Sequence, residues 1–151
     1  MVQRKLDGLM KSIEGELNQV RDEFLKNIAE DLVRATPKGV PDGSPVDTGA
    51  YMSSHSITTT RGAGRSRTSH GKAPNKDPQA ASVEALSALM GDISSLPNEA
   101  PAIYIANNSP HASRVEYGGW AKVGPYAVYT GVRERAGLHL AAAVAKVRGS
   151  T

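Results

Sequence analysis

Residues 44–57 read SPVDTGAYMSSHSI, and the other predicted elements are arranged around this stretch. Pro45 fixes its own backbone φ and favours an extended conformation for the residue before it. Asp47 and Thr48 carry side chains that cap helices, and Gly49 permits a tight turn that a bulkier residue could not make. The stretch is therefore predicted to form a loop, then a capped turn, then a strand over residues 52–60.

A long amphipathic helix is predicted before this stretch, over residues 2–35. Its apolar residues recur in steps of three and four and so share one face. They are Leu6, Leu9, Ile13, Leu17, Val20, Phe24, Ile28 and Leu32. At ~1.5 Å per residue the helix spans roughly 50 Å, more than a core of this size can cover. Two interpretations stay open: a helix packed in the core, or one whose end packs on a neighbouring subunit.

Smaller elements are predicted after the stretch. Asp77 and Pro78 are typical of a helix start, and this helix is expected to end at Gly91. Residues 102–106 form the clearest strand, and residues 111–120 contain a helical turn followed by two glycines. A C-terminal helix is predicted from about 126 to 148. The apolar faces of the two helices carry Val83, Leu86, Leu89 and Met90, and Val128, Val132, Ala136, Leu140, Val144 and Val147.

These elements predict an α+β fold in a single domain over residues 1–151. A small mixed or antiparallel sheet lies between the long N-terminal helix and the C-terminal helix. Residues 61–100 form an insertion made of a basic loop and a helix. Its loop carries five basic residues, Arg61, Arg65, Arg67, Lys72 and Lys76. The loop is open to three interpretations, namely a solvated surface, a contact with DNA, or a contact with an acidic protein surface, of which the protein contact is preferred.

Several chemistries are excluded or disfavoured by the composition. The chain has no cysteine, which excludes disulfides and thiolate catalysis. Its four histidines are far apart in the sequence, so no metal site is expected. Gly71-Lys72 lacks the spacing and the following Ser or Thr of a phosphate-binding loop, and no cofactor is expected. No secretion signal or membrane-spanning run is evident, which predicts a soluble protein that is made in a cytoplasm and has no membrane contact.

The tetrapeptide at residues 47–50, Asp-Thr-Gly-Ala, also occurs in dimeric aspartic proteases of the retroviral type. Such a site needs its Asp at the end of an apolar strand, so that two loops share a proton across a dimer axis. The residues before Asp47 are rich in Pro and Gly and cannot form that strand. Capping is the preferred role of Asp47, and no enzymatic activity is expected.

Three segments of the chain resemble the neck, or tail-completion, family of tailed bacteriophages, the head–tail joining proteins that are gene-product-ten-like. They are Pro-Val-Asp-Thr-Gly at residues 45–49, Val-Glu-Tyr-Gly at residues 115–118, and the closing Ala-rich helix. Glu116 and Gly118 belong to the second motif. The family usually has a compact hairpin where this chain has residues 61–100, and Pro-Phe where this chain has Pro125-Tyr126.

The resemblance implies a non-enzymatic structural protein of the virion, assembled in the cytoplasm of a bacterial host. It implies a homo-oligomeric ring of six copies, or of twelve, at the head–tail junction. The partners implied are the head-connector or adaptor protein, the tail-tube protein, and DNA that passes through the channel with non-specific contacts. A basic DNA-associated accessory protein is the alternative within binding proteins.

Two aromatic residues flank the double glycine. Tyr117 is an interface candidate, open to two interpretations: it anchors the turn on the core, which is slightly preferred, or it contacts an adjoining ring. Trp120 is expected to contact an adjoining ring, since aromatic side chains supply large interface areas.

Overall fold

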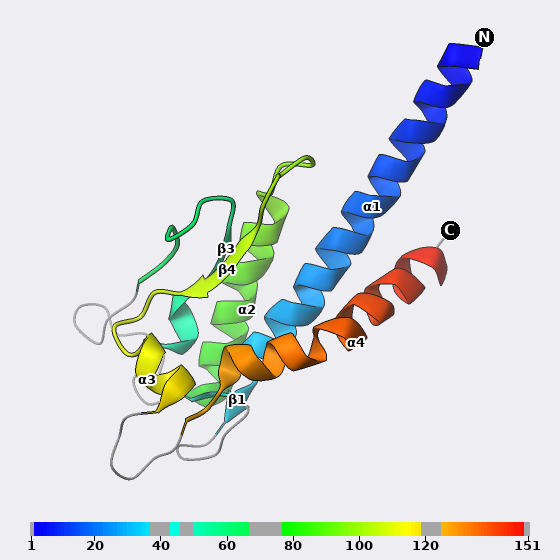
Figure 1. The fold of residues 1–151 in the computed structure, drawn as a ribbon. Helices are drawn as coiled ribbons and strands as arrows, with labels where there is room; N and C mark the ends of the chain where they lie inside the picture. The colour runs from blue at the N-terminus through cyan, green and yellow to red at the C-terminus, as the bar shows by residue number, and fades with distance from the viewer. Residues whose placement is uncertain (1, 37–42, 46–49, 67–76, 119–124, 150–151) are drawn as a thin grey trace.

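The computed structural model describes residues 2–36, 43–45, 50–66, 77–118 and 125–149 (Figure 1). The helices in this part of the chain are α1 (Val2–Leu32), α2 (Pro78–Ser94), α3 (Ala112–Tyr117), α4 (Val128–Gly149) and the 3₁₀ helix η1 (Met52–Ser54). The strands are β1 (Ala35–Thr36), β2 (Ser44–Pro45), β3 (His55–Thr58) and β4 (Tyr104–Asn107). The predicted α+β class, with a long helix at the start and another helix at the end, is confirmed.

The strands form two separate pairs rather than one small mixed sheet. β1 and β2 are parallel and two residues long, whereas β3 and β4 are antiparallel, with His55 opposite Asn107 and Thr58 opposite Tyr104. The predicted strand over residues 52–60 is wrong at its start, where Met52–Ser54 form η1. The hydroxyls of Ser53 and Ser54 donate to the carbonyl of Ala50 at 3.3 and 2.6 Å, and such local bonds favour a turn over a strand.

Helix α2 begins as predicted but runs further than predicted. The Asp77 carboxylate accepts a hydrogen bond from the Ala80 backbone N–H at 2.9 Å. The helix continues through Gly91 to Ser94, and Ile93 is buried. A mid-helix Gly costs about 1 kcal/mol, whereas burial of an Ile side chain contributes ~1.5–3 kcal/mol, so the extra turn is favoured.

The predicted apolar face of α2 is confirmed except at Val83. Leu89 is buried, and Leu86 and Met90 are partly buried against the first core cluster. Val83, which was expected on this face, is exposed. The buried residues Ala81, Ala85, Leu89 and Ile93 follow steps of four, so the packed face includes two alanines that the prediction did not list.

Two clusters of buried residues form the core, and α1 contributes to both. One lies between α1, α2 and β3, and the other between α1, α3 and α4. The first contains Leu25, Ala29, Val33, Met52, Ile57, Ala81, Ala85, Leu89 and Ile93. The second contains Ile28, Leu32, Tyr51, Val115, Tyr126, Val128 and Val132.

Helices α1 and α4 lie side by side in opposite directions (Figure 1). Polar contacts join them in this order along α1: Glu23 with Lys146, Asn27 with the His139 carbonyl, and Asp31 with the side chains of Arg135 and His139. Helix α1 extends well beyond α4 at its N-terminal end (Figure 1).

Candidate interaction surface

The described residues of the stretch at 44–57 include several that belong to the core. Asp47, Thr48 and Gly49 lie outside the described residues, and of Pro45 only the backbone, in β2, is described. The second half is buried: Met52 and Ile57 belong to the first cluster, and Tyr51 to the second. The stretch therefore connects the two clusters, which explains why its sequence is so poor in charged residues.

His55 is at the centre of a buried polar network in this stretch. Its Nε2 lies 3.0 Å from the Ser44 hydroxyl, which donates to the Leu32 carbonyl at the end of α1. Ser44 therefore accepts from Nε2–H, and the Nδ1 of the same ring accepts from the Tyr129 hydroxyl at 2.8 Å. Burial, together with the charge of Arg65, lowers the pKa of His55 to about 3. The imidazole is neutral and joins β2, β3 and α4.

This arrangement brings a serine and a histidine together but does not form a nucleophilic site. Ser44 is 0% exposed and His55 is 1% exposed, so a substrate has no access to either. The Ser44 hydroxyl donates to a backbone carbonyl rather than to the imidazole. The pair satisfies buried polar groups, which is the role that buried networks of this kind have in stabilising a fold.

Glu116, in the second motif of the resemblance, caps α4. Its two carboxylate oxygens accept from the backbone N–H groups of Tyr129 and Thr130 at 2.9 and 2.8 Å. The Thr130 hydroxyl donates to the same carboxylate at 2.7 Å. The side chain is 9% exposed, so a negative charge is held at the positive end of the α4 dipole with little screening. Sequence reasoning did not find this role, because the acceptor lies 13 or 14 residues before its donors.

Gly118 ends α3 with a backbone φ of 85°, a conformation that favours glycine. A Cβ at this position lies 3.4 Å from the ring of Pro125. The Tyr126 N–H donates to the Val115 carbonyl at 2.8 Å, which fixes the start of α4 against α3. The prediction that the short helix ends at this glycine is therefore confirmed. The turn after α3 places Glu116 next to the first turn of α4.

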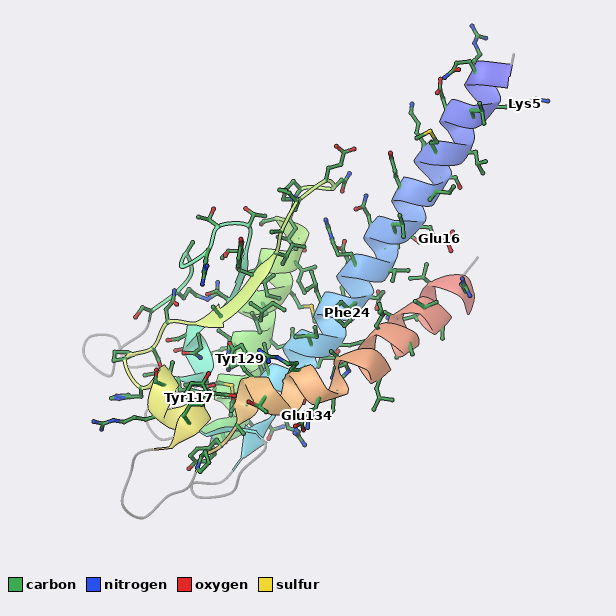
Figure 2. All side chains as sticks on the ribbon, in the orientation of Figure 1. Lys5, Glu16, Phe24, Tyr117, Tyr129 and Glu134 are labelled. Carbon is green, nitrogen blue, oxygen red and sulfur yellow. The ribbon has the colours of Figure 1, made fainter. Side chains whose placement is uncertain are left out.

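Tyr117 is 79% exposed, so the prediction that it anchors the turn on the core is wrong (Figure 2). Helix α3 has only six residues, and its inward side is occupied by Val115 and Glu116. Tyr117 therefore remains on the outside, where it is available to a partner. Trp120 lies outside the described residues, and its predicted contact with an adjoining ring stays a prediction.

The structure separates the two described arginines of the basic loop. Arg65 forms a bidentate pair with the Asp92 carboxylate at 2.9 and 2.7 Å and donates to the His55 carbonyl at 2.7 Å. Arg65 therefore holds the start of the insertion onto α2 and β3. Arg61 is exposed, and Arg67, Lys72 and Lys76 lie outside the described residues.

The N-terminal half of α1 carries five of the exposed large apolar side chains among the described residues. We call this surface the α1 stripe. Its members are Leu6 (49% exposed), Leu9 (57%), Met10 (59%), Ile13 (48%) and Leu17 (63%). Five large apolar side chains in a row at helical spacing are unusual on the surface of a soluble chain and mark a candidate interaction surface.

The described residues contain no group of three or more His, Cys, Asp or Glu side chains that could hold a metal ion. In the same part of the chain, no helix has the length and apolar character needed to cross a membrane. Comparisons with models of known protein families, with curated proteins and with solved structures gave no match.

Proposed function

We propose that this chain is a structural protein of a tailed bacteriophage virion, one of the rings through which DNA passes at the head–tail junction. The proposal starts from the resemblance of residues 45–49, residues 115–118 and the closing helix to neck proteins. It assigns the chain a place between the head connector and the tail, and no catalytic role.

The observation that carries the proposal is that two of the resembling segments, residues 115–118 and the closing helix, contact each other directly. Glu116 of the second motif bonds the first turn of α4, which is the closing helix. Tyr51, just after the first motif, packs in the same cluster as Val115 and Val128. Short motifs that occur by chance have no reason to meet in this way.

The exposed apolar side chains are what we expect in a protein that functions by associating with other protein chains. The α1 stripe and Tyr117 are exposed on different elements, so one copy can contact two neighbours. Contacts of this kind, with aromatic and aliphatic side chains at the centre of an interface, are typical of stable assemblies.

The test is electron microscopy of particles made by the phage after deletion of this gene. We expect DNA-filled heads and separate, complete tails, and normal virions when the wild-type gene is supplied from a plasmid. Complementation with Tyr117→Ala is expected to join fewer heads to tails than complementation with Arg61→Ala, because Tyr117 offers apolar contact area.

Intact virions after deletion would overturn the proposal. The basic loop would then be the segment to test, by measuring whether the purified chain binds DNA in a gel-shift assay.

A further inference from the structure

The apolar residues of α1 follow an 11-residue repeat. The steps from Leu6 to Leu17, which we call the first repeat, are three, four and four. The steps from Leu17 to Ile28, which we call the second repeat, are again three, four and four. An 11-residue repeat corresponds to ~3.67 residues per turn, so the stripe follows the helix axis closely and suits lengthwise packing against another helix.

The second repeat shows what this pattern packs against. Ile28 belongs to the second core cluster and Phe24 packs against it. Along the same part of α1, Glu23, Asn27 and Asp31 bond α4. Lys146 is level with Glu23, and α4 ends three residues later at Gly149. Helix α4 therefore ends about level with Val20, just below the first repeat. The first repeat is exposed because no described helix runs beside it, and only its end at Leu17 lies near the loop that contains Asn98 and Glu99.

We propose that the α1 stripe pairs with the α1 stripe of a second copy of this chain, with the two helices antiparallel. Leu6 of each copy then lies near Leu17 of the other, and Met10 lies near the two-fold axis. In this pair, the α1 helix of the partner packs against each stripe, as α4 packs against the second repeat within one copy.

The charge of the segment favours a copy of the same chain over nucleic acid or an anionic membrane. Residues 2–17 contain three basic side chains (Arg4, Lys5, Lys11) and three acidic ones (Asp7, Glu14, Glu16), so the net charge is 3 − 3 = 0. Nucleic acid and anionic membranes attract segments with an excess of basic residues, which this helix lacks. Two neutral helices approach each other without net repulsion.

The area of the stripe is sufficient for a stable pair. Complete burial of an aliphatic side chain removes about 100 Å² from water, so five side chains in each of two copies remove on the order of 1,000 Å². Flanking residues add to this, which brings the pair to the ~1,200–2,000 Å² of specific interfaces.

Steric constraints select the antiparallel arrangement. In a parallel pair, the second repeat of the partner helix would run along the side of α1 that α4 already covers from about Val20 onward. In an antiparallel pair, it continues beyond the N-terminal end of α1, where no described element lies (Figure 1). The two folded bodies are then at opposite ends of the paired helices.

This inference does not depend on the proposed function. A two-fold pair is a different contact from the repeated contact between neighbours around a closed ring. Stripe pairing can therefore be found in a chain that has no role in a phage, and a neck protein can form rings without it.

The first test compares Ile13→Glu with Ser12→Glu in the full chain, by sedimentation velocity. Ile13 is in the stripe, and the adjacent Ser12 is exposed and outside it, so the same side chain is introduced on two different faces. For the wild type we expect a dimer of the 15.9 kDa chain, or an even multiple of it if rings form. Ile13→Glu is expected to raise the dissociation constant of the pair by more than ~100-fold, because each pair would bury two carboxylates without partners. Ser12→Glu is expected to leave the mass unchanged.

The second test is cysteine cross-linking, for which the absence of native cysteines makes single substitutions unambiguous. Met10→Cys alone is expected to form a covalent dimer on mild oxidation. Leu6→Cys mixed with Leu17→Cys is expected to form a mixed dimer, whereas Leu17→Cys alone is not. A covalent dimer of Leu17→Cys alone would indicate a parallel pair and overturn the arrangement. A wild-type mass of one chain at every concentration, or an Ile13→Glu chain with unchanged mass, would overturn the pairing itself.

Discussion

The two halves of α1 have the same apolar repeat but opposite surroundings. Leu6 is 49% exposed, whereas Leu32 is fully buried. The difference does not come from α1, whose pattern is continuous, but from the elements beside it. Helix α4 and the buried residues Tyr51, Met52 and Ile57 pack on the C-terminal half, and none of them packs on residues 6–17. A sequence pattern thus defines which face of a helix is apolar, while the rest of the fold decides how much of that face is covered.

The largest expected effect is the contrast between Leu32→Ala and Leu6→Ala. Leu32→Ala is expected to lower the free energy of unfolding by about 2–5 kcal/mol, since it leaves a cavity in a packed core. Leu6→Ala is expected to change it by less than ~0.5 kcal/mol, since the residue is half exposed and belongs to neither core cluster.

Urea denaturation at a chain concentration low enough to keep the protein monomeric measures both values. Similar losses for the two variants would mean that the halves of α1 do not differ in packing as the structure indicates.

The network around His55 makes the free energy of unfolding depend on pH. This effect concerns the buried C-terminal half of α1, because Ser44 links the imidazole to the end of that helix. The pKa of His55 is about 3 in the folded chain, against an ordinary value of 6.5, because of burial and the charge of Arg65. As the pH falls below 6.5, the unfolded chain takes up a proton that the folded chain does not. The free energy of unfolding should then fall by ~1.4 kcal/mol per pH unit, or about 2 kcal/mol between pH 6.5 and pH 5.

His55→Gln and His111→Gln, compared by urea denaturation across this pH range, isolate the effect. The slope is expected to disappear in His55→Gln and to persist in His111→Gln, whose histidine is exposed. Asp31 does not affect the slope between pH 6.5 and pH 5. Burial raises the pKa of its carboxyl group, but hydrogen bonds from Arg135 and His139 outweigh this effect and lower the pKa below 3.8. Asp31 therefore changes the free energy of unfolding only in stronger acid. An unchanged slope in His55→Gln would show that His55 is not buried as a neutral group.

A smaller effect is expected from Glu116→Gln, which tests how α4 is held at its start. The substitution keeps the shape of the side chain but removes the negative charge at the helix N-terminus. We expect a loss of about 1–2 kcal/mol in the free energy of unfolding.

Glu134→Gln is the matched control for Glu116→Gln, because Glu134 is an exposed residue of the same helix (Figure 2). Its expected change in the free energy of unfolding is less than ~0.5 kcal/mol. Equal changes in the two variants would indicate that the Glu116 carboxylate does not cap α4.

Much of the fold was predictable from local patterns in the sequence. The long helices follow from their apolar spacing, and the start of α2 follows from Asp77 and Pro78. The errors arose where contacts distant in sequence decide the outcome. Ser53 and Ser54 bond Ala50 and form a turn instead of a strand, and Val83 is exposed whereas Ala81 and Ala85 of the same helix are buried.

The candidate surface was predictable only in part. The length of α1 predicted that it exceeds the core, but which end is bare depends on where α4 ends. The exposure of Tyr117 follows from the inward side of α3 being filled by Val115 and Glu116. The capping role of Glu116 depends on a contact that no local pattern reveals.

Hydrogen exchange along α1, measured over a dilution series, tests the central claim most directly. The account predicts that amides of residues 20–32 are protected at every concentration, because α4 and the core cover them. It predicts that amides of residues 6–17 exchange rapidly in the monomer and become protected as the chain associates. Protection of residues 6–17 in the monomer, or rapid exchange of these residues in the associated form, would contradict it.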